Sequence, residues 1–435
     1  MSQCRGDIAI IGLACIFPEA PNARCFWENT RNVDTVPDPA PDWEVELAAT
    51  ALADAGYGDP AKLKELRPRT ELIIGNTTPG LLDTISGRIA ARLGLMGPNY
   101  MVAADSASSL VAVDLAVNDL CGGRCDMVLA GGVHSPPSPA GMAISSQVKA
   151  LSLGMGMLVL KRLEDAERAG DRVYAVIKGV AASSGGQGIQ GEEMAFRRAY
   201  EAAAVDPATV EMIESHGASG MAGIIRTVLA LHHKVLPPSL QRESSSPKPD
   251  LDRRNFYTSS GMRPWIHGSN EIPRRAAVEA FGGIHAHAVL EEYTGRHPAR
   301  CLQHDWDSEM FVISGETRPE MLREAERLRE FVTSFSGELP LKDLAWTLNC
   351  KNPKAARLVI VATSRDDLKE KLGRAVERLR DERTTRIRAI DGVYYFSQPL
   401  AGKVALVFPG EGAQYINMLA DLCAHFPEVR EFFDR

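Results

Sequence analysis

The residue with the clearest chemical potential is Ser106, within residues 100–117 (YMVAADSASSLVAVDLAV). The stretch begins like a short strand, and the apolar residues after Ser106 recur at helical spacing, which predicts a strand-to-helix turn at Ser106. A nucleophile there gains from the unsatisfied N–H groups and the positive dipole end of the helix, which also stabilise an oxyanion. Serines at such a turn also cap helices. Taken alone, the stretch favours that role for Ser106, Ser108 and Ser109.

Three histidines could also take part in chemistry. His216 ends a predicted strand over residues 210–215, where an imidazole could act as a general base or donate to an oxyanion. A lone histidine at a strand end is more commonly structural. His285 and His287 stand at period two on a predicted strand and therefore share one face. Two such histidines could bind a metal, but no third ligand is near them in sequence, which favours a core position.

Two patterns typical of cofactor sites are incomplete. Residues 186–191 (GQGIQG) match the G-x-G-x-x-G of nicotinamide-binding proteins. The acidic residue expected about twenty positions later would be Asp206, which opens a predicted strand rather than ending one. Cys121 and Cys125 form a C-x3-C pair with no second pair beside it, which argues against a zinc site.

The elements that would position Ser106 and His216 alternate between strands and helices over the first 295 residues. Predicted buried strands begin at Ile8, Glu71 and Asp126, and predicted helices cover residues 81–95, 106–121 and 221–233. Such alternation indicates an α/β fold with mixed or parallel sheets that are covered on both faces.

Two shorter regions follow. Residues 296–400 contain strand-like runs between charged amphipathic helices, which predicts a small α/β module without a catalytic constellation. Residues 404–415 (VALVFPGEGAQY) and an amphipathic helix then begin a third unit.

Composition restricts the class of protein. The chain has 435 residues, 45% hydrophobic and 24% charged, which is typical of a globular protein of about two or three domains. A net charge of −7 argues against a general binder of nucleic acid or anionic membranes. The apolar runs are too short to span a bilayer, and eight cysteines are too few for a disulfide scaffold. We therefore expect a cytoplasmic protein.

Taken together, these stretches resemble the ketosynthase domain of modular and iterative type I polyketide synthases. Residues 7–30 (DIAIIGLACIFPEAPNARCFWENT) resemble the family opening, and residues 106–133 resemble its nucleophile helix and the strand after it. Further matches follow in order over residues 157–184, 205–217, 229–240 and 273–292. Residues 85–90 (ISGRIA) and the GEGAQY turn favour iterative synthases of the polyunsaturated-fatty-acid, heterocyst-glycolipid or enediyne kind.

The resemblance implies three parts: a thiolase-like ketosynthase over 1–295, a ketosynthase-to-acyltransferase linker over 296–400, and the start of an acyltransferase over 401–435. The implied activity is a decarboxylative Claisen condensation between acyl and malonyl thioesters on acyl carrier protein. Ser106 would occupy the position of the family's nucleophilic cysteine, and His216 that of its first histidine. The resemblance further implies a homodimer, no metal and no organic cofactor.

This sequence departs from the family pattern at several places. Ser106 replaces the cysteine, and a hydroxyl is deprotonated far less readily than a thiol. The family's K-S-x-I-G-H segment, with its lysine and second histidine, is missing after Gly217. His287 matches a different family position, in N-A-H, and His285 replaces the asparagine there. Loops near residues 152–154 and 281–283 are shortened, and the acyltransferase motif G-H-S-x-G does not occur.

Two hypotheses follow. In the first, the protein is a ketosynthase whose activity is impaired by serine at position 106. In the second, it is a non-catalytic homologue that resembles a chain-length factor or a scaffold protein. A serine hydrolase is a weaker alternative, because no G-x-S-x-G elbow occurs.

Overall fold

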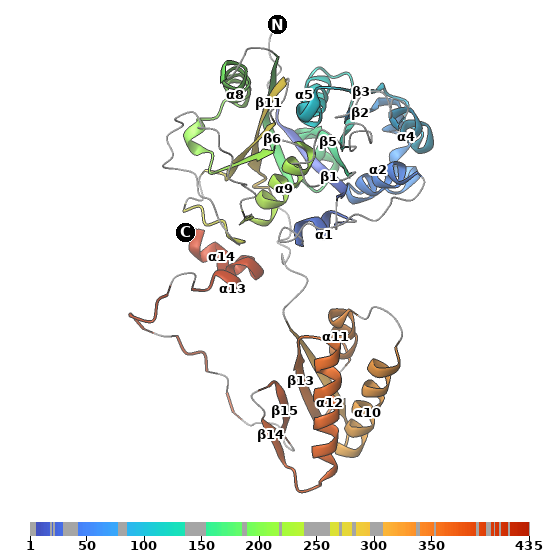
Figure 1. Cartoon of the computed structure of the whole chain (residues 1–435), viewed down its shortest axis with the longest axis vertical. Coiled ribbons are helices and arrows are strands. Elements are labelled where there is room, and N and C mark those ends of the chain that lie inside the picture. Colours follow the sequence, from blue (N-terminus) through green and yellow to red (C-terminus); the bar gives the residue numbers. More distant parts are fainter. Residues whose placement is uncertain are drawn as a thin grey trace, which may run out of the picture. The chain divides into compact units, whose positions relative to one another are not determined.

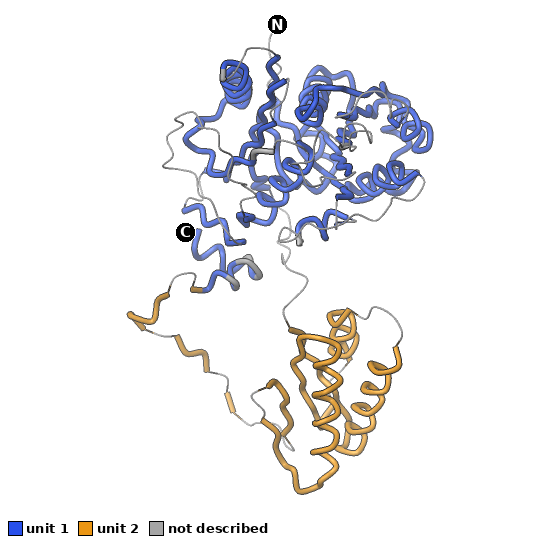
Figure 2. Tube along the Cα trace, viewed as in Figure 1, with its two compact units in different colours: residues 1–300, 419–435 blue, residues 301–418 orange. Residues whose placement is uncertain are grey.

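The computed structural model divides the chain into two compact units (Figure 2). The first contains residues 1–300 and 419–435, and the second contains residues 301–418. The structure describes residues 6–17, 20, 22–28, 42–76, 85–134, 154–184, 189–216, 220–238, 262–268, 272–280, 284–295, 308–335, 340–351, 354–388, 391–396, 402–403, 405–408, 410–415 and 418–434.

The first unit is built on a nine-stranded mixed sheet in the order β3-β2-β4-β5-β1-β6-β11-β10-β7. The strands are β1 (Ile8–Ile16), β2 (Thr70–Asn76), β3 (Asn99–Val102), β4 (Met127–His134), β5 (Gly154–Arg162), β6 (Ala175–Ser184), β7 (Met212–His216), β10 (Arg275–Ala280) and β11 (Ile284–Glu292). A short pair, β8 (Val235–Leu236) and β9 (Arg263–Pro264), stands apart from the sheet. The two halves of the sheet meet at one short junction, where residues 8–10 of β1 pair with residues 175–177 of β6.

Helices pack on this sheet (Figure 1). They are α1 (Ala23–Glu28), α2 (Trp43–Asp54), α3 (Pro60–Leu63), α4 (Ile85–Leu93), α5 (Ser108–Cys121), α7 (Leu163–Ala169), α8 (Ile189–Ala203) and α9 (Gly220–His233). Helix α5 contacts β2 and β4 of one half and β6 and β11 of the other, and α9 likewise contacts strands of both halves. Helix α9 is buried on all sides from Gly220 to Leu231, as expected for an apolar helix inside a domain. The predicted layered α/β arrangement is therefore present.

The second unit is the small α/β module expected from the sequence. Its antiparallel sheet has the order β12-β13-β15-β14 and carries three helices. The elements are β12 (Glu309–Gly315), β13 (Ala356–Ala362), β14 (Arg386–Arg388), β15 (Val393–Phe396), α10 (Arg318–Ser334), α11 (Leu341–Asn349) and α12 (Arg365–Arg380). Thr317 and Ser364 cap α10 and α12 with their hydroxyl groups. Alternate side chains of β12 and β13 are buried, so one face of the sheet forms the core.

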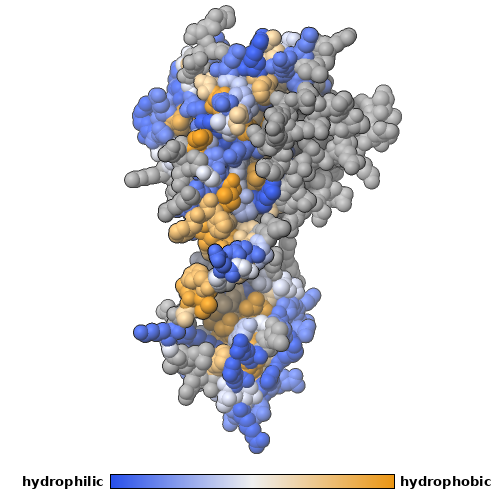
Figure 3. All heavy atoms as spheres, turned by 90° about the vertical axis from the view of Figure 1, so that its left-hand side faces the viewer, coloured by the Kyte–Doolittle hydropathy of each residue, from blue (hydrophilic) through white to orange (hydrophobic). Residues whose placement is uncertain are grey.

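The C-terminal segment carries two short helices, α13 (Ala420–His425) and α14 (Pro427–Asp434), on the first unit. Asp434 forms an ion pair with buried Arg274 at 2.6 Å, and the Arg430 guanidinium donates a hydrogen bond to the carbonyl oxygen of His233 at 2.8 Å. Leu406, Val407 and Phe408 lie before these helices and are more than three-quarters exposed. Figure 3, which faces the side on which α13 and α14 lie in Figure 1, shows apolar surface at the height of these helices.

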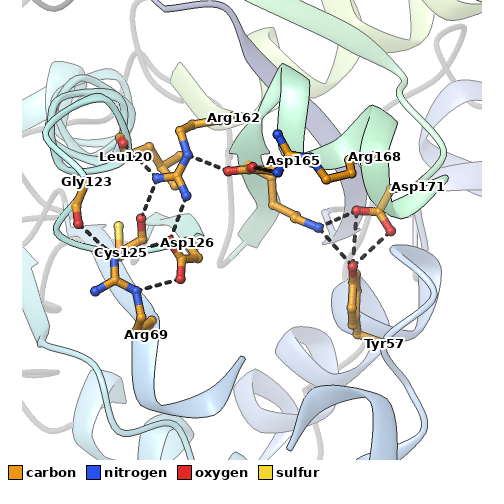
Figure 4. Close-up of polar contacts among 11 residues, drawn as sticks. Tyr57, Arg69, Leu120, Gly123, Cys125, Asp126, Arg162, Asp165, Arg168 and Asp171 are labelled. Carbon is orange, nitrogen blue, oxygen red and sulfur yellow. Dashed lines mark hydrogen bonds and ion pairs between the residues drawn. The ribbon is translucent and has the colours of Figure 1, made fainter. Parts of the chain in front are cut away.

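Ion pairs connect the starts of β2 and β4 with the end of β5 (Figure 4). Arg162, the last residue of β5, donates to Asp126 at 2.6 Å and to Asp165 at 2.5 Å. Arg69 donates to the same Asp126 at 2.5 Å. Arg162 also donates to the carbonyl groups of Leu120 and Cys125 and thereby holds the end of α5.

A second polar cluster beside it is buried. The Lys161 ammonium donates to Asp171 at 2.6 Å and to the Tyr57 hydroxyl at 3.0 Å, and Tyr57 donates to Asp171 at 2.9 Å. The side chains of Lys161 and Asp171 are 6% and 9% exposed. Burial alone would lower the pKa of Lys161, but the hydrogen bonds to Asp171 and Tyr57 outweigh it and raise this pKa.

No helix among the described residues combines the length and apolar character needed to cross a bilayer.

We expect Lys161→Met to lower the free energy of unfolding of the first unit by about 3 to 5 kcal/mol, because it leaves the Asp171 carboxylate buried without its cation. Arg168→Ala is the matched control, since Arg168 pairs with Asp165 on the surface and such pairs contribute about 1 kcal/mol or less. Urea unfolding followed by circular dichroism measures both variants. Equal losses in the two variants would contradict the structural importance of the buried cluster.

Candidate functional site

Ser106 lies on the tight turn between β3 and α5. Residues Asp105–Ala107 form a single turn of 3-10 helix, and α5 begins at Ser108. Asp105 has φ of 52°, in the left-handed region that a residue with a side chain rarely adopts. Such a conformation costs about 1 to 3 kcal/mol and persists only where the surrounding structure holds it.

The hydroxyl of Ser108 holds this turn. It accepts a hydrogen bond from the backbone N–H of Ala104 at 2.8 Å. It also lies 2.6 Å from the carbonyl oxygen of Asp105 and 3.0 Å from that of Asn76, and shares its single proton between them. The Ser108 side chain is fully buried, so water does not compete for these contacts.

The serines do not cap α5 in the way that the stretch alone suggested. Ala107 is the N-cap residue, and it provides no side-chain hydrogen bond to the first N–H groups of the helix. Ser108 instead bonds to the turn that precedes the helix. Ser106 is half-buried, and none of the residues described here forms a hydrogen bond with its hydroxyl.

The amino terminus of α9 lies beside the turn that precedes α5, so two helix amino termini are close to Ser106. Helix α9 begins at Gly220, where a Cβ atom would lie 3.6 Å from the carbonyl oxygen of Ser106 and 3.5 Å from Cβ of Ser109. Each terminus carries unsatisfied N–H groups and about half a positive charge. Negative charge that develops on an acyl group at this place would be stabilised by both.

His216 is the last residue of β7, as predicted, but its side chain lies outside the described residues. The sheet register pairs Ala280 of β10 with His216 on one side and with Ala286 of β11 on the other. The His216 backbone is therefore two strands, about 10 Å, from β11. The turn that carries Ser106 packs against this same β11. A contact between the side chains of Ser106 and His216 stays a prediction, and residues 217–219 and 281–283 lie outside the described residues.

His287 is a core residue. It is 3% exposed and packs against the rings of Phe196 and Tyr200, at centroid distances of 5.1 and 5.3 Å. Its Nδ1 lies 3.6 Å from a carboxylate oxygen of Glu279. Burial lowers the pKa of His287 to about 4, so the ring is neutral at neutral pH. Among the residues that the structure describes, no group of histidines, cysteines or carboxylates has the arrangement of a metal site.

Sequence reasoning missed the residues that shape the turn. Gly75 is required because a Cβ atom there would lie 2.4 Å from the Ser108 carbonyl group. Glycine inside an otherwise apolar strand marks such a close approach, and that signal was present in residues 71–76 (ELIIGN). The left-handed Asp105 had no comparable signal.

Two family models match the chain. Residues 48–156 match the beta-ketoacyl synthase N-terminal domain, and residues 312–379 match the RhiE-like, KS-MAT linker domain. These matches confirm the resemblance to ketosynthases seen in the sequence and identify a beta-ketoacyl synthase N-terminal domain over residues 48–156.

Curated relatives are much longer proteins. One polyunsaturated fatty acid synthase polypeptide of Thraustochytrium is 28% identical over 450 residues, which cover 81% of this chain and 16% of that polypeptide. Polyketide synthase GfsA of Streptomyces halstedii is 30% identical over 420 residues, which cover 79% of this chain and 5% of the synthase. The first alignment is longer than this chain although only 81% of the chain takes part, so the relative holds residues that have no counterpart here.

Solved ketosynthases share the fold. The ketosynthase from module 6 of the bacillaene synthase of Bacillus subtilis 168 aligns with a TM-score of 0.57 and 23% identity, over 85% of each chain. An oxazolomycin ketosynthase domain of Streptomyces albus JA3453 aligns with a TM-score of 0.58 and 22% identity, over 86% of this chain and 88% of that domain. The predicted thiolase-like fold is confirmed by these likenesses.

The buried His287 generates a prediction about pH. As the pH falls from 6.5, histidine in the unfolded chain gains a proton, while His287 in the folded protein stays neutral until about pH 4. Stability should therefore fall with pH through this window, by about 3 kcal/mol in total. In urea unfolding, the His287→Leu variant should lose this part of the pH dependence of the free energy of unfolding. Above pH 7, the difference in free energy of unfolding between the variant and the unchanged protein should be constant. Parallel curves from pH 7 down to pH 4 would show that the neutral buried ring does not control this window.

Proposed function

We propose that this chain is a ketosynthase that joins an acyl group to a malonyl-derived unit, both carried as thioesters on acyl carrier protein. The observation that carries the proposal is the strained turn that presents Ser106 beside the amino termini of α5 and α9. The match of residues 48–156 to the beta-ketoacyl synthase N-terminal domain supports the same reaction. The proposed reaction needs no metal and no organic cofactor.

In the first half-reaction, the Ser106 oxygen attacks the carbonyl carbon of the acyl thioester. The carbon–sulfur bond breaks, and the carrier thiol leaves with the proton of the hydroxyl group, which leaves an acyl ester on Ser106. In the second half-reaction, the malonyl thioester loses carbon dioxide and its carbanion attacks this ester. The ester carbon–oxygen bond breaks, and the Ser106 oxygen recovers a proton that comes from water. We assign to His216 the transfer of these protons.

Serine slows the first half-reaction. A thiol is partly ionised near neutral pH and is intrinsically nucleophilic, whereas a hydroxyl depends on a base throughout the transfer. The helix amides still orient the acyl carbonyl, so binding survives where turnover is slow. We therefore propose an impaired enzyme rather than an efficient one.

A non-catalytic role is the second candidate. The family's lysine and second histidine have no counterpart in this sequence, and a relative holds residues that this chain lacks. A homologue that resembles a chain-length factor or a scaffold would keep the fold without the nucleophile.

The remaining assignments are also proposals. Residues 296–400 would connect the ketosynthase to an acyltransferase, of which residues 401–435 would form the first part. The exposed apolar side chains at 406–408 support this view, because these residues form no core of their own. The six cysteines that the structure describes are free thiols, which supports a place in the reducing cytoplasm.

Ser106→Cys tests the enzyme hypothesis. We expect the variant to be acylated by an acyl thioester faster than the unchanged protein by on the order of 100-fold or more, the usual size of one general-base contribution. Intact-protein mass spectrometry measures the acyl adduct. Ser109→Cys is the matched control, because that side chain is buried against Gly132 and should stay unmodified. A folded Ser106→Cys variant that remains inert would favour the non-catalytic role.

We also expect a homodimer. Closed two-fold dimers are the commonest oligomers, and β3 is an edge strand whose outer backbone groups have no strand partner among the described residues. Sedimentation equilibrium at micromolar concentration should give the mass of a dimer. A stable monomer under those conditions would contradict the assignment.

A further inference from the structure

We propose that Ser108 is a positioning residue that fixes the group at position 106, by holding Asp105 in its left-handed conformation. The proposal deepens the proposed function and rests on it for its catalytic meaning. The structural part of the proposal, that Ser108 holds the turn, is supported by hydrogen bonds within the first unit.

The three contacts of the Ser108 hydroxyl span the whole turn. The N–H of Ala104 belongs to a peptide group before the strained Asp105, and the carbonyl of Asp105 belongs to the peptide group after it, so the hydroxyl holds the backbone on both sides of that residue. Asn76, the last residue of β2, anchors the hydroxyl to the sheet across 32 residues of sequence. The Ser108 hydroxyl oxygen therefore connects β2, the turn at Asp105 and the start of α5.

Burial makes these contacts hard to replace. Ser108 is fully buried, and its backbone lies directly against Gly75 of β2. Removing the hydroxyl leaves the Ala104 N–H without its acceptor in a site from which water is excluded. Asp105 could then relieve its own strain by leaving the left-handed region, and residue 106 would turn away from the amino terminus of α5.

Ser109 provides the matched control. It is the next residue of the same helix, has the same side chain and is 5% exposed. It packs against Gly132, and no described residue hydrogen-bonds with its hydroxyl as the turn does with that of Ser108. Ser109→Ala therefore removes a hydroxyl from a nearly as deeply buried residue without touching the turn.

The experiment uses Ser106→Cys as its background, because a thiol at position 106 reports its own surroundings. Iodoacetamide alkylation of the peptide that contains residue 106, measured by mass spectrometry against pH, gives the pKa and the reactivity of this thiol. A helix amino terminus lowers a thiol pKa. Adding Ser108→Ala should raise that pKa by about one unit and slow alkylation at neutral pH about tenfold, whereas Ser109→Ala should change neither.

A rescue variant separates positioning from general stability. Asp105→Gly removes the cost of the left-handed conformation, because glycine adopts positive φ freely. Combined with Ser108→Ala, it should restore most of the thiol reactivity. The proposal is overturned if Ser108→Ala behaves like Ser109→Ala, or if Asp105→Gly restores nothing.

Folding failure is also informative. If Ser108→Ala does not fold, recovery of a folded and reactive protein by Asp105→Gly supports the proposal, and failure of the double variant overturns it. Acylation by an acyl thioester is measured on the same proteins. Absence of acylation in the Ser106→Cys parent would refute the proposed function, while alkylation would still decide the role of Ser108.

Discussion

The packing of the first unit depends on how closely helices α5 and α9 approach the strands of the sheet around them. Helix α5 lies so near β2 and β4 that a Cβ atom at Gly75 would meet the Ser108 backbone, and one at Gly132 would meet the Ser109 side chain. Any larger residue at either strand position would push the start of α5 outward. The same contacts set the depth of Ser106, because the turn that carries it is fixed between β3 and α5.

The opposite ends of the same strands are held by charge rather than by close packing. Arg162 connects Asp126, Asp165 and the carbonyl group of Leu120 near the end of α5, and the Lys161 cluster is buried beside it. Helix α5 is thus fixed at both ends, by glycine contacts at its amino terminus and by Arg162 at its carboxyl terminus. A helix held in this way has little freedom to relax when its first turn is disturbed, so strain at Asp105 can be maintained.

The sequence predicted the elements better than it predicted their interactions. Helical periodicity located α5 and α9, and alternation of strands and helices indicated the layered α/β fold. The strand-to-helix turn at Ser106 was also predictable, since a strand-like run and a helical run meet there. The role of Ser108 was not, because its contact with Asn76 joins residues that are far apart in sequence. The buried Lys161, Asp171 and Tyr57 cluster was hidden for the same reason, since each residue alone reads as a surface residue.

The exposed apolar stretch before α13 has a consequence for how the protein behaves in solution. Leu406, Val407 and Phe408 are 80%, 88% and 83% exposed, within an uncharged run (VALVF) of high β-propensity. Residues 405–408 form no strand here, and an apolar run of this kind can pair as a strand with an identical run from another molecule. Lys403 and Pro409 flank it and restrict that pairing in the manner of gatekeeper residues. Association through these few residues would act against the repulsion that a net charge of −7 provides between molecules in concentrated solution.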